Sequence, residues 1–348
     1  MIIRAPTPDD NDTLCRLFNA TPMGNRIQVV FDRSPDFFVG ARIQADSPWT
    51  LAAFDERTGK AIGCFSAGTR RVFVHGKPRD VRYLSDLRIH PNHRGGRLLF
   101  EGYRRLGQMM GPGEIAQTII LKDNARALKL LTSRRAGLPH YFPAGTYATL
   151  FLPAGQRRRR ESSSYTILRA SQADIPSIQA FHTAQSQARD FAPVIDFAKL
   201  APSLAITDFL LAYHGKQLVS LIGLWDQSTI RRVRIHRYAP LLKVARPFST
   251  LLSGIPLPRE GDVIPITYLT STASHPDHLA ALRALVDHAL AQLPRRRLLV
   301  AGFDTRDPSL QAFRGLRQRR ECGQHFLVAY DAPPKPTAGP FVMDPGRI

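Results

Sequence analysis

The chain has few cysteines and no long apolar run. Its 348 residues include only three cysteines, and Cys15, Cys64 and Cys322 lie far apart. Three distant thiols give neither a disulfide framework nor the ligand spacing of a metal site, so we expect no metal. No apolar stretch approaches the roughly 18 residues that a membrane-spanning helix needs. Polar residues follow Met1 almost at once, without the apolar segment of a signal peptide. We therefore expect a cytoplasmic protein without a membrane span.

Acidic residues are scarce relative to basic ones. The chain carries 48 lysines and arginines against 28 aspartates and glutamates, a formal net charge of +20, and 40 of the basic residues are arginines. Such an excess favours polyanionic partners: phosphorylated cofactors, nucleic acid, acidic lipid or acidic protein. Arginine-rich codon usage in the host explains the same composition equally well, so the charge alone identifies no partner.

The predicted elements repeat along the chain. With 43% hydrophobic residues, 348 positions are enough for about two domains with a core each. Residues 3–9 and 168–174 share a pattern, and each precedes a helix-like segment. We expect a domain at 1–152, an Arg/Ser-rich linker at 153–164, a second domain at 165–332 and an irregular tail at 333–348.

The most distinctive stretch runs from Tyr83 to Tyr103. Its pattern predicts a strand that Pro91 ends, a basic glycine turn at residues 94–97 and then a helix. A glycine turn that opens a helix leaves N–H groups unpaired at the positive end of the helix dipole, so it can bind an anion. Simple alternation in the strand predicts one face with Val81, Tyr83, Ser85, Leu87 and Ile89 and another with Leu84, Asp86 and Arg88.

Two motifs resemble those of the GNAT superfamily of N-acetyltransferases. Residues 87–99 resemble the family's Arg/Gln-x-x-Gly-x-Gly/Ala turn, which wraps the CoA pyrophosphate, and residues 123–138 resemble its Asn-x-x-Ala helix. The resemblance covers residues 1 to about 152, and the second half looks like a diverged copy. It implies an α/β fold with a mixed sheet and two tandem GNAT-like acyltransferase domains. It also implies an N-acetyltransferase that binds acetyl-CoA in a splay between two strands.

The resemblance further implies roles for individual residues. Backbone groups of Leu87, Arg88 and Ile89 would hold the acyl and pantetheine end of the cofactor. Asn124 would bond the pantetheine arm, although an asparagine here fits a helix cap equally well. The pyrophosphate would lie on the turn and the start of the helix, at Arg94, Gly95, Gly96, Arg97, Leu98 and Leu99.

The match to the family is incomplete. Whether Arg94 or Gly96 is aligned with the start of the motif, a bulky residue stands where the family has a small one. Leu131 stands where many members have the tyrosine that protonates the departing thiolate. A general acid would therefore come from elsewhere, for example from Tyr141 or Tyr147.

Asp86 is the candidate catalytic residue, because it is the only carboxylate in the predicted strand from Val81 to Ile89. It would act as a base or position the amine, or it would simply pair with Arg88 two residues on. The second half lacks the signature, since residues 270–278 contain neither glycine nor arginine. We expect no CoA site of the usual kind there, and a helix start capped by Ser274 or Asp277.

Three functions follow from these patterns. The favoured one is an acetyl-CoA-dependent N-acyltransferase with an unidentified amine acceptor. The alternatives are a non-catalytic acyl-CoA-binding or interaction protein, and an RNA-associated transferase that uses aminoacyl-tRNA. Alternating Arg232, Arg234 and His236 would bind an acidic acceptor or RNA, or form a solvated strand face. Aromatic residues are sparse there, so nucleic acid is possible but not favoured.

Overall fold

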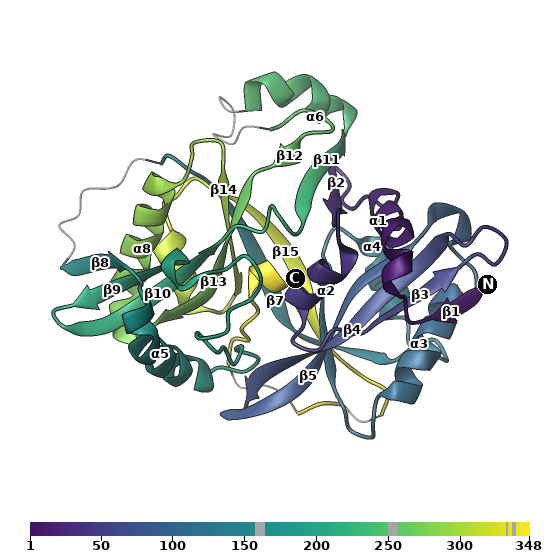
Figure 1. The fold of residues 1–348 in the computed structure, drawn as a ribbon, viewed down its shortest axis with the longest axis horizontal. Coiled ribbons are helices and arrows are strands. Elements are labelled where there is room, and N and C mark those ends of the chain that lie inside the picture. The colour runs from purple at the N-terminus through teal and green to yellow at the C-terminus, as the bar shows by residue number, and fades with distance from the viewer. Residues whose placement is uncertain (157–163, 250–256, 332, 336–338) are drawn as a thin grey trace.

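The computed structural model describes residues 1–156, 164–249, 257–331, 333–335 and 339–348. Most of the predicted linker, residues 157–163, lies outside the described residues. Two groups of helices flank a long twisted sheet, and the C-terminal residues lie between them (Figure 1). Among the described residues, no helix is both long and apolar enough to cross a membrane.

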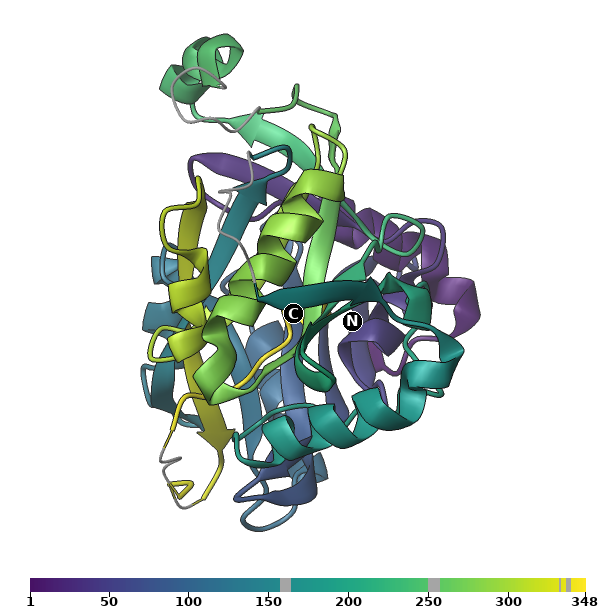
Figure 2. The same cartoon turned by 90° about the vertical axis from the view of Figure 1, so that its left-hand side faces the viewer.

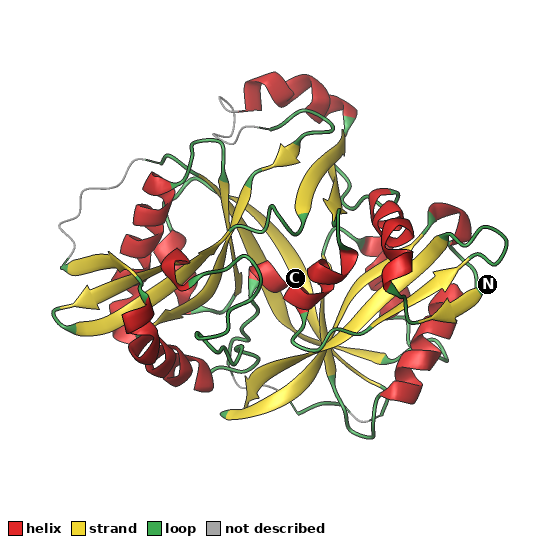
Figure 3. Ribbon diagram, viewed as in Figure 1, coloured by secondary structure: helices red, strands yellow, loops and turns green. Residues whose placement is uncertain are grey.

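A mixed sheet of twelve strands runs through the described chain (Figure 3). Its neighbouring strands are antiparallel except for the β5–β6 and β13–β14 pairs. In spatial order the strands are β1 (Ile2–Arg4), β3 (Thr50–Phe54), β4 (Ala61–Val74), β5 (Lys77–Ile89), β6 (Ala116–Leu121), β15 (Arg319–Ala329), β7 (His140–Pro153), β14 (Leu298–Asp304), β13 (Ile266–Ser274), β10 (Gln217–Trp225), β9 (Phe209–His214) and β8 (Tyr165–Arg169). The predicted mixed α/β fold class is confirmed.

The two halves of the sequence share their last strands. β15, from the end of the second half, lies between β6 and β7 of the first half. β7 in turn pairs with β14 of the second half. Each half therefore completes its part of the sheet with a strand from the other. One sheet therefore contains strands from both of the predicted ranges, 1–152 and 165–332.

Helices cover both faces of the sheet in each half. In the first half, α1 (Asn11–Asn19) and α2 (Phe37–Gln44) pack on one face, and α3 (Leu98–Met109) and α4 (Ala125–Leu131) on the other. In the second half, α5 (Ile175–Gln187) and α8 (Leu279–Gln292) cover opposite faces (Figure 2). Short 3₁₀ helices complete the elements: η1 (Pro8–Asp10), η2 (Pro91–His93), η3 (Gln172–Asp174), η4 (Ile206–Asp208), η5 (Arg246–Phe248), η6 (Pro276–His278), η7 (Pro308–Phe313) and η8 (Pro345–Arg347).

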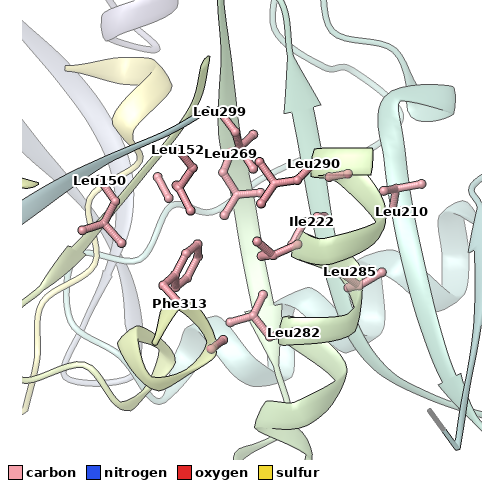
Figure 4. Packing of buried hydrophobic residues seen from close by; sticks show 14 of the residues in the cluster. Leu150, Leu152, Leu210, Ile222, Leu269, Leu282, Leu285, Leu290, Leu299 and Phe313 are labelled. Atoms are coloured by element: carbon pink, nitrogen blue, oxygen red, sulfur yellow. The ribbon is translucent and has the colours of Figure 1, made fainter. Parts of the chain in front are cut away.

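The largest core lies under α8, where strands β7, β9, β10, β13 and β14 meet the helix and η7 (Figure 4). Most of its side chains are aliphatic. Burial of such side chains is the main favourable term in folding. The labelled members in Figure 4 are Leu150, Leu152, Leu210, Ile222, Leu269, Leu282, Leu285, Leu290, Leu299 and Phe313.

Capping boxes explain where the first helical segment of each half begins. Thr7 and Asp10 form one box, and Ser171 and Asp174 form the other. Asp10 also accepts two hydrogen bonds from Arg4, at 2.6 and 2.8 Å, and these lower the pKa of the carboxyl to about 2. The repeat seen in the sequence therefore corresponds to the same local structure in both halves.

A three-stranded sheet links the two halves at one end of the molecule. β2 (Ile27–Asp32) of the first half pairs with β11 (Arg232–Tyr238) of the second, and β12 (Val263–Ile264) pairs with β11. The short helix α6 (Pro240–Ala245) follows β11 and stands apart from the large sheet in both views (Figures 1 and 2). We call this unit of β2, β11, β12, α6 and η5 the arm.

The described part of the tail is irregular apart from η8, but it is buried. Phe341 and Met343 pack in a core between the halves, together with Tyr83 and Tyr147. Arg231 donates to the carbonyl oxygens of Gly346 and Ile348, at 3.0 and 2.7 Å. The tail therefore binds both halves through main-chain groups.

Candidate active site

A β-bulge interrupts strand β5 at Asp86. Cys64 of β4 lies opposite Arg88, but Ser66 lies opposite Ser85, so two residues of β5 face one residue of β4. Asp86 has a φ of +57°, in the left-handed region that aspartate tolerates better than most residues. The bulge inserts one residue into the alternation of the strand.

This bulge makes the predicted faces of β5 wrong. Ser85 and Asp86, predicted on opposite faces, both meet the same group of side chains. The Ser85 hydroxyl donates to Gln44 Oε1 at 3.4 Å, and Arg33 Nη2 donates to Gln44 Oε1 at 2.8 Å and to Asp86 Oδ2 at 2.7 Å. Leu87 instead lines a cavity with residues of α3. The strand thus turns a carboxylate and a hydroxyl toward α2.

The partner of Asp86 is Arg33 rather than the predicted Arg88. The side chains of Arg33 and Asp86 are 1% and 6% exposed, so this is a buried ion pair. Arg33 stacks near the rings of Phe18 and Phe37, at 4.7 and 5.2 Å from the centroids. Nothing in the sequence pattern points to Arg33, which joins β2 to α2. Only the folded chain brings it to β5.

Arg88 makes different contacts on the same face. Its Nη1 lies 2.7 Å from the sulfur of Met23, and its guanidinium lies 5.1 Å from the ring centroid of Phe18. Burial lowers the pKa of Arg88. Met23 belongs to the segment that precedes β2.

Strands β5 and β6 separate just before the bulge. They pair only at Arg82 with Ala116 and at Tyr83 with Gln117. The Thr118 hydroxyl then donates to the Leu84 carbonyl at 2.8 Å, and beyond this point β6 continues its ladder with β15. The backbone of residues 85–89 is therefore left without a ladder to β6, as the predicted splay requires.

The glycine turn after β5 is open. Residues 91–97 are all exposed, and Gly95 has a φ of +87°. A Cβ added at Gly95 would meet nothing within 4 Å, and at Gly96 the nearest atom would be the His93 carbonyl oxygen at 4.0 Å. Arg94 Nε donates to the Ile89 carbonyl at 3.1 Å, which ties the turn to the end of the strand. The turn leads into α3 at Leu98, and among the described residues no group lies within 4 Å of a Cβ added at Gly95.

Asn124 caps helix α4. Its side-chain oxygen accepts a hydrogen bond from the backbone N–H of Ala127 at 3.2 Å. This is the structural role that the sequence offered as an alternative. A contact of its amide nitrogen with pantetheine stays a prediction, because the cap uses only the oxygen.

A narrow apolar cavity of about 20 Å³ lies between α3 and strands β3, β4 and β5. It borders the bulge, and Gly63 and Gly102 bring its walls close together. A Cβ at Gly63 would lie 2.7 Å from Leu98, and one at Gly102 would lie 3.1 Å from Phe65. The cavity is lined mainly by Leu51, Phe65, Leu87, Ile89, Leu98, Leu99 and Tyr103.

Two tyrosines were predicted as replacements for the missing proton donor. Tyr141 shares a 2.5 Å hydrogen bond with Tyr103, which lines the cavity. Burial raises the pKa of Tyr103 to about 12 and that of Tyr141 well above its ordinary value. Tyr147 donates to the Met343 carbonyl at 3.0 Å inside the core between the halves. Of the two, Tyr141 is therefore the one connected to the cavity.

The second half contains a counterpart of the bulge. Ser271 of β13 has a φ of +52°, and two residues of β13 face one residue of β10 there. The tail covers this position: the Ser271 N–H donates to Asp344 Oδ2 at 3.2 Å, and the Thr270 hydroxyl donates to the same oxygen. The equivalent place in the second half is thus occupied by the chain itself.

The turn after β13 is shorter than the turn after β5. In both halves a histidine precedes a 3₁₀ turn and accepts a hydrogen bond from the N–H two residues on, His90 from Asn92 and His275 from Asp277. α8 begins at Leu279 directly after this turn, without glycines. The predicted cap by Ser274 or Asp277 is wrong, because the side chain of His275 caps the turn instead. In the described chain, no group of three or more His, Cys, Asp or Glu side chains could hold a metal ion.

Comparison with known proteins relates the fold to acyltransferases. No family model and no curated protein sequence matches the chain. Among solved structures, it is similar to Saccharomyces cerevisiae N-myristoyltransferase with bound myristoyl-CoA, with a TM-score of 0.60 and 13% identity over 95% of this chain and 80% of that one. It is also similar to a GCN5-related N-acetyltransferase from Sphaerobacter thermophilus, with a TM-score of 0.57 and 13% identity over 97% and 98% of the two chains. The chain therefore shares the overall fold of these two solved structures.

Proposed function

We propose that the protein is an acyl-CoA-dependent N-acyltransferase whose cofactor binds in the first half. The observation that carries the proposal is the separation of β5 from β6 beside the bulge at Asp86, followed directly by an open glycine turn at the start of α3. A separated strand edge can hydrogen-bond an extended pantetheine arm, and a helix start can bind phosphates. Both structural neighbours are acyltransferases by name, which supports this choice among the functions that the fold allows.

The proposed cofactor contacts follow the strand and the turn. Backbone groups of Leu87, Arg88 and Ile89 hold the acyl and pantetheine end. The amide nitrogen of Asn124, which the helix cap leaves free, donates to the arm. The pyrophosphate lies on the open turn and the first N–H groups of α3, at Arg94, Gly95, Gly96, Arg97, Leu98 and Leu99.

Acyl transfer requires an uncharged amine next to a held thioester. The amine nitrogen attacks the thioester carbonyl carbon, the C–N bond forms, and the carbonyl oxygen takes the negative charge. Backbone N–H groups at the bulge stabilise this charge. The C–S bond then breaks, the thiolate takes up a proton, and the amine loses one to a base or to water.

Asp86 is the proposed group that positions the amine. Its Oδ2 is held by Arg33, but Oδ1 has no partner among the residues that the structure describes. This oxygen can therefore accept a hydrogen bond from the acceptor amine and orient its lone pair. Tyr141, kept protonated by burial and linked to the cavity through Tyr103, is the proposed source of the thiolate's proton.

We further propose that the acyl group is short, in practice acetyl. The cavity beside Leu87 and Ile89 measures about 20 Å³, which is close to the space that one water molecule needs. A methyl group can occupy such a space. A long acyl chain would have to displace Leu98 and Phe65, which line the cavity next to Gly63 and Gly102.

Calorimetric titration of acetyl-CoA tests the proposal. We expect micromolar binding at about one site per chain, and at least tenfold weaker binding for Arg94→Glu, Arg97→Glu. The matched control is Arg295→Glu, Arg296→Glu, which makes the same charge change at an exposed turn of the second half. Equal losses in both variants would indicate general electrostatic attraction, and no binding of any acyl-CoA would contradict the proposal.

A turnover assay distinguishes an enzyme from a non-catalytic acyl-CoA-binding protein. Release of free CoA with a panel of small polar amines, compared between acetyl-CoA and myristoyl-CoA, should favour acetyl-CoA. Binding without turnover on any acceptor would support the non-catalytic alternative. Copurifying RNA, with binding that falls steeply as salt rises, would support the RNA-associated alternative.

A further inference from the structure

An exposed apolar stripe runs along the helix of the arm. Leu241, Val244 and Phe248 are 88%, 78% and 61% exposed, although large apolar side chains are usually covered. Their spacing places them on one side of the continuous helical segment formed by α6 and η5. The ribbon of this segment stands away from the large sheet in both views (Figures 1 and 2).

Several basic side chains lie near this stripe. Residues 229–249 contain six lysines and arginines and no aspartate or glutamate. Of these six, Arg231 is buried and Arg232 and Arg234 pair with Asp32, which leaves Arg237, Lys243 and Arg246 next to the helix. Arg237 and Lys243 are exposed beside the helix, and Lys243 pairs with Glu260 at 2.8 Å. Arg26 is also exposed, and its carbonyl accepts the N–H of Ala239 at 2.8 Å, directly before the helix. The stripe therefore projects from a surface of clear positive charge.

We propose that this arm docks on the surface of an anionic lipid bilayer, with Leu241, Val244 and Phe248 inserted among the lipids. A helix with an apolar face and basic flanks lies in the plane of a membrane interface, and its basic residues are attracted to acidic headgroups. The proposal does not depend on the proposed enzyme activity.

The size of the stripe favours a bilayer over a protein partner. A stable protein interface buries about 800 Å² on each side and involves some 20–30 residues. Three side chains on two helical turns supply much less than that. Shallow insertion into a bilayer needs only a few apolar side chains when several basic residues add electrostatic attraction. A second copy of this chain is disfavoured as well, because it would carry the same charge of +20.

Docking through the arm would bring the candidate active site near the membrane surface. Arg232 and Arg234 of β11 both bond Asp32 at the end of β2, at 3.1 and 3.0 Å. The next residue, Arg33, holds Asp86. The arm and the site are thus joined by one short strand, so a lipid-bound arm fixes the orientation of the site toward the membrane.

Cosedimentation with vesicles tests the docking. The full chain should bind vesicles of phosphatidylcholine with 30% phosphatidylglycerol at least tenfold more tightly than pure phosphatidylcholine vesicles. Leu241→Asp, Val244→Asp should weaken binding to the anionic vesicles at least tenfold. The matched control is Ile2→Asp, Leu168→Asp, which replaces two other exposed apolar side chains, at 49% and 52% exposure, with the same charge change.

A tryptophan variant distinguishes insertion of the stripe into the bilayer from purely electrostatic adsorption of a basic protein. Phe248→Trp places a probe in the stripe, and its emission should shift to shorter wavelength on anionic vesicles and be quenched by brominated lipid chains. An equal loss of binding in both aspartate variants would overturn the proposal. So would the absence of a spectral shift while the protein is bound, or the absence of binding to anionic vesicles. Thermal unfolding of each variant verifies that its fold is intact.

Discussion

Replacing Arg33 by methionine should destabilise the protein strongly, and a second substitution should restore part of the loss. The Arg33→Met variant leaves Asp86 as an unpaired carboxylate that is only 6% exposed. Removal of one partner from a buried ion pair costs about 3–5 kcal/mol. The expected fall in the free energy of unfolding is therefore about 3–5 kcal/mol, measured by urea unfolding at neutral pH.

The double variant Arg33→Met, Asp86→Asn should be more stable than Arg33→Met alone. Asparagine removes the buried charge and still tolerates the φ of +57° at this position, so the backbone adds no new strain. Arg33 Nε and Nη1 are buried and have no hydrogen-bond partner in the described part of the chain. Their removal takes away a desolvation penalty of about 1–3 kcal/mol for each group. Wild type and double variant should then differ by about 2 kcal/mol or less.

The double-mutant cycle tests whether Arg33 and Asp86 interact, and two outcomes would contradict the interaction. If the two single substitutions simply add in the double variant, the groups do not interact and the pairing at 2.7 Å carries no energy. A cost below about 1 kcal/mol for Arg33→Met would show that Asp86 is well solvated instead of buried. Either result would remove the basis for treating Asp86 as a fixed group in the site.

Three further predictions concern other buried or capping groups. Burial lowers the pKa of His182 to about 4 and that of His325 to about 3. In the unfolded chain both histidines have a pKa of about 6.5, so below this pH the unfolded chain binds two protons that the folded protein does not. The free energy of unfolding should fall by about 2 kcal/mol for each histidine between pH 7 and pH 5, and the variant with glutamine at both positions should lose this dependence. Asp344→Ala removes the acceptor of three buried hydrogen bonds and should cost about 2–4 kcal/mol in thermal unfolding, with acetyl-CoA affinity unchanged within twofold. Asn124→Asp should keep the helix cap and the stability but lower acetyl-CoA affinity, whereas Asn124→Ala should lose about 1 kcal/mol as well; equal affinity for all three proteins would exclude a pantetheine contact.

The sequence predicted the broad architecture because the two halves repeat local patterns. The mixed α/β class, the open glycine turn and the helix after it follow from spacing that acts over a few residues. The faces of β5 were not predictable in this way, because Asp86 adds one residue to the strand and changes the alternation for every residue after it. The pattern of side chains alone gives no sign that a polar residue takes a positive φ.

The contacts of the site depend on residues far apart in the chain. Arg33 reaches Asp86 across 53 positions, and Asp344 reaches Thr270 across 74. The sequence offered Arg88 as the partner of Asp86 because it lies two residues away, and it described the tail only as irregular. Proline and glycine correctly excluded regular structure there, but they say nothing about burial. Tertiary packing determines both the partner of Asp86 and the burial of the tail.

The exchange of β7 and β15 between the halves has a consequence for folding during synthesis. His325 of β15 pairs with Ile119 of β6, so this part of the sheet brings together residues about two hundred positions apart. While the ribosome is still producing the second half, β6 and β7 of the nascent chain lack the strand that lies between them. The unpaired edges of such an intermediate are prone to aggregation, and pairings of this range form slowly. Association of the emerging first half with a chaperone, lasting until residue 329 has left the ribosome, would protect these edges.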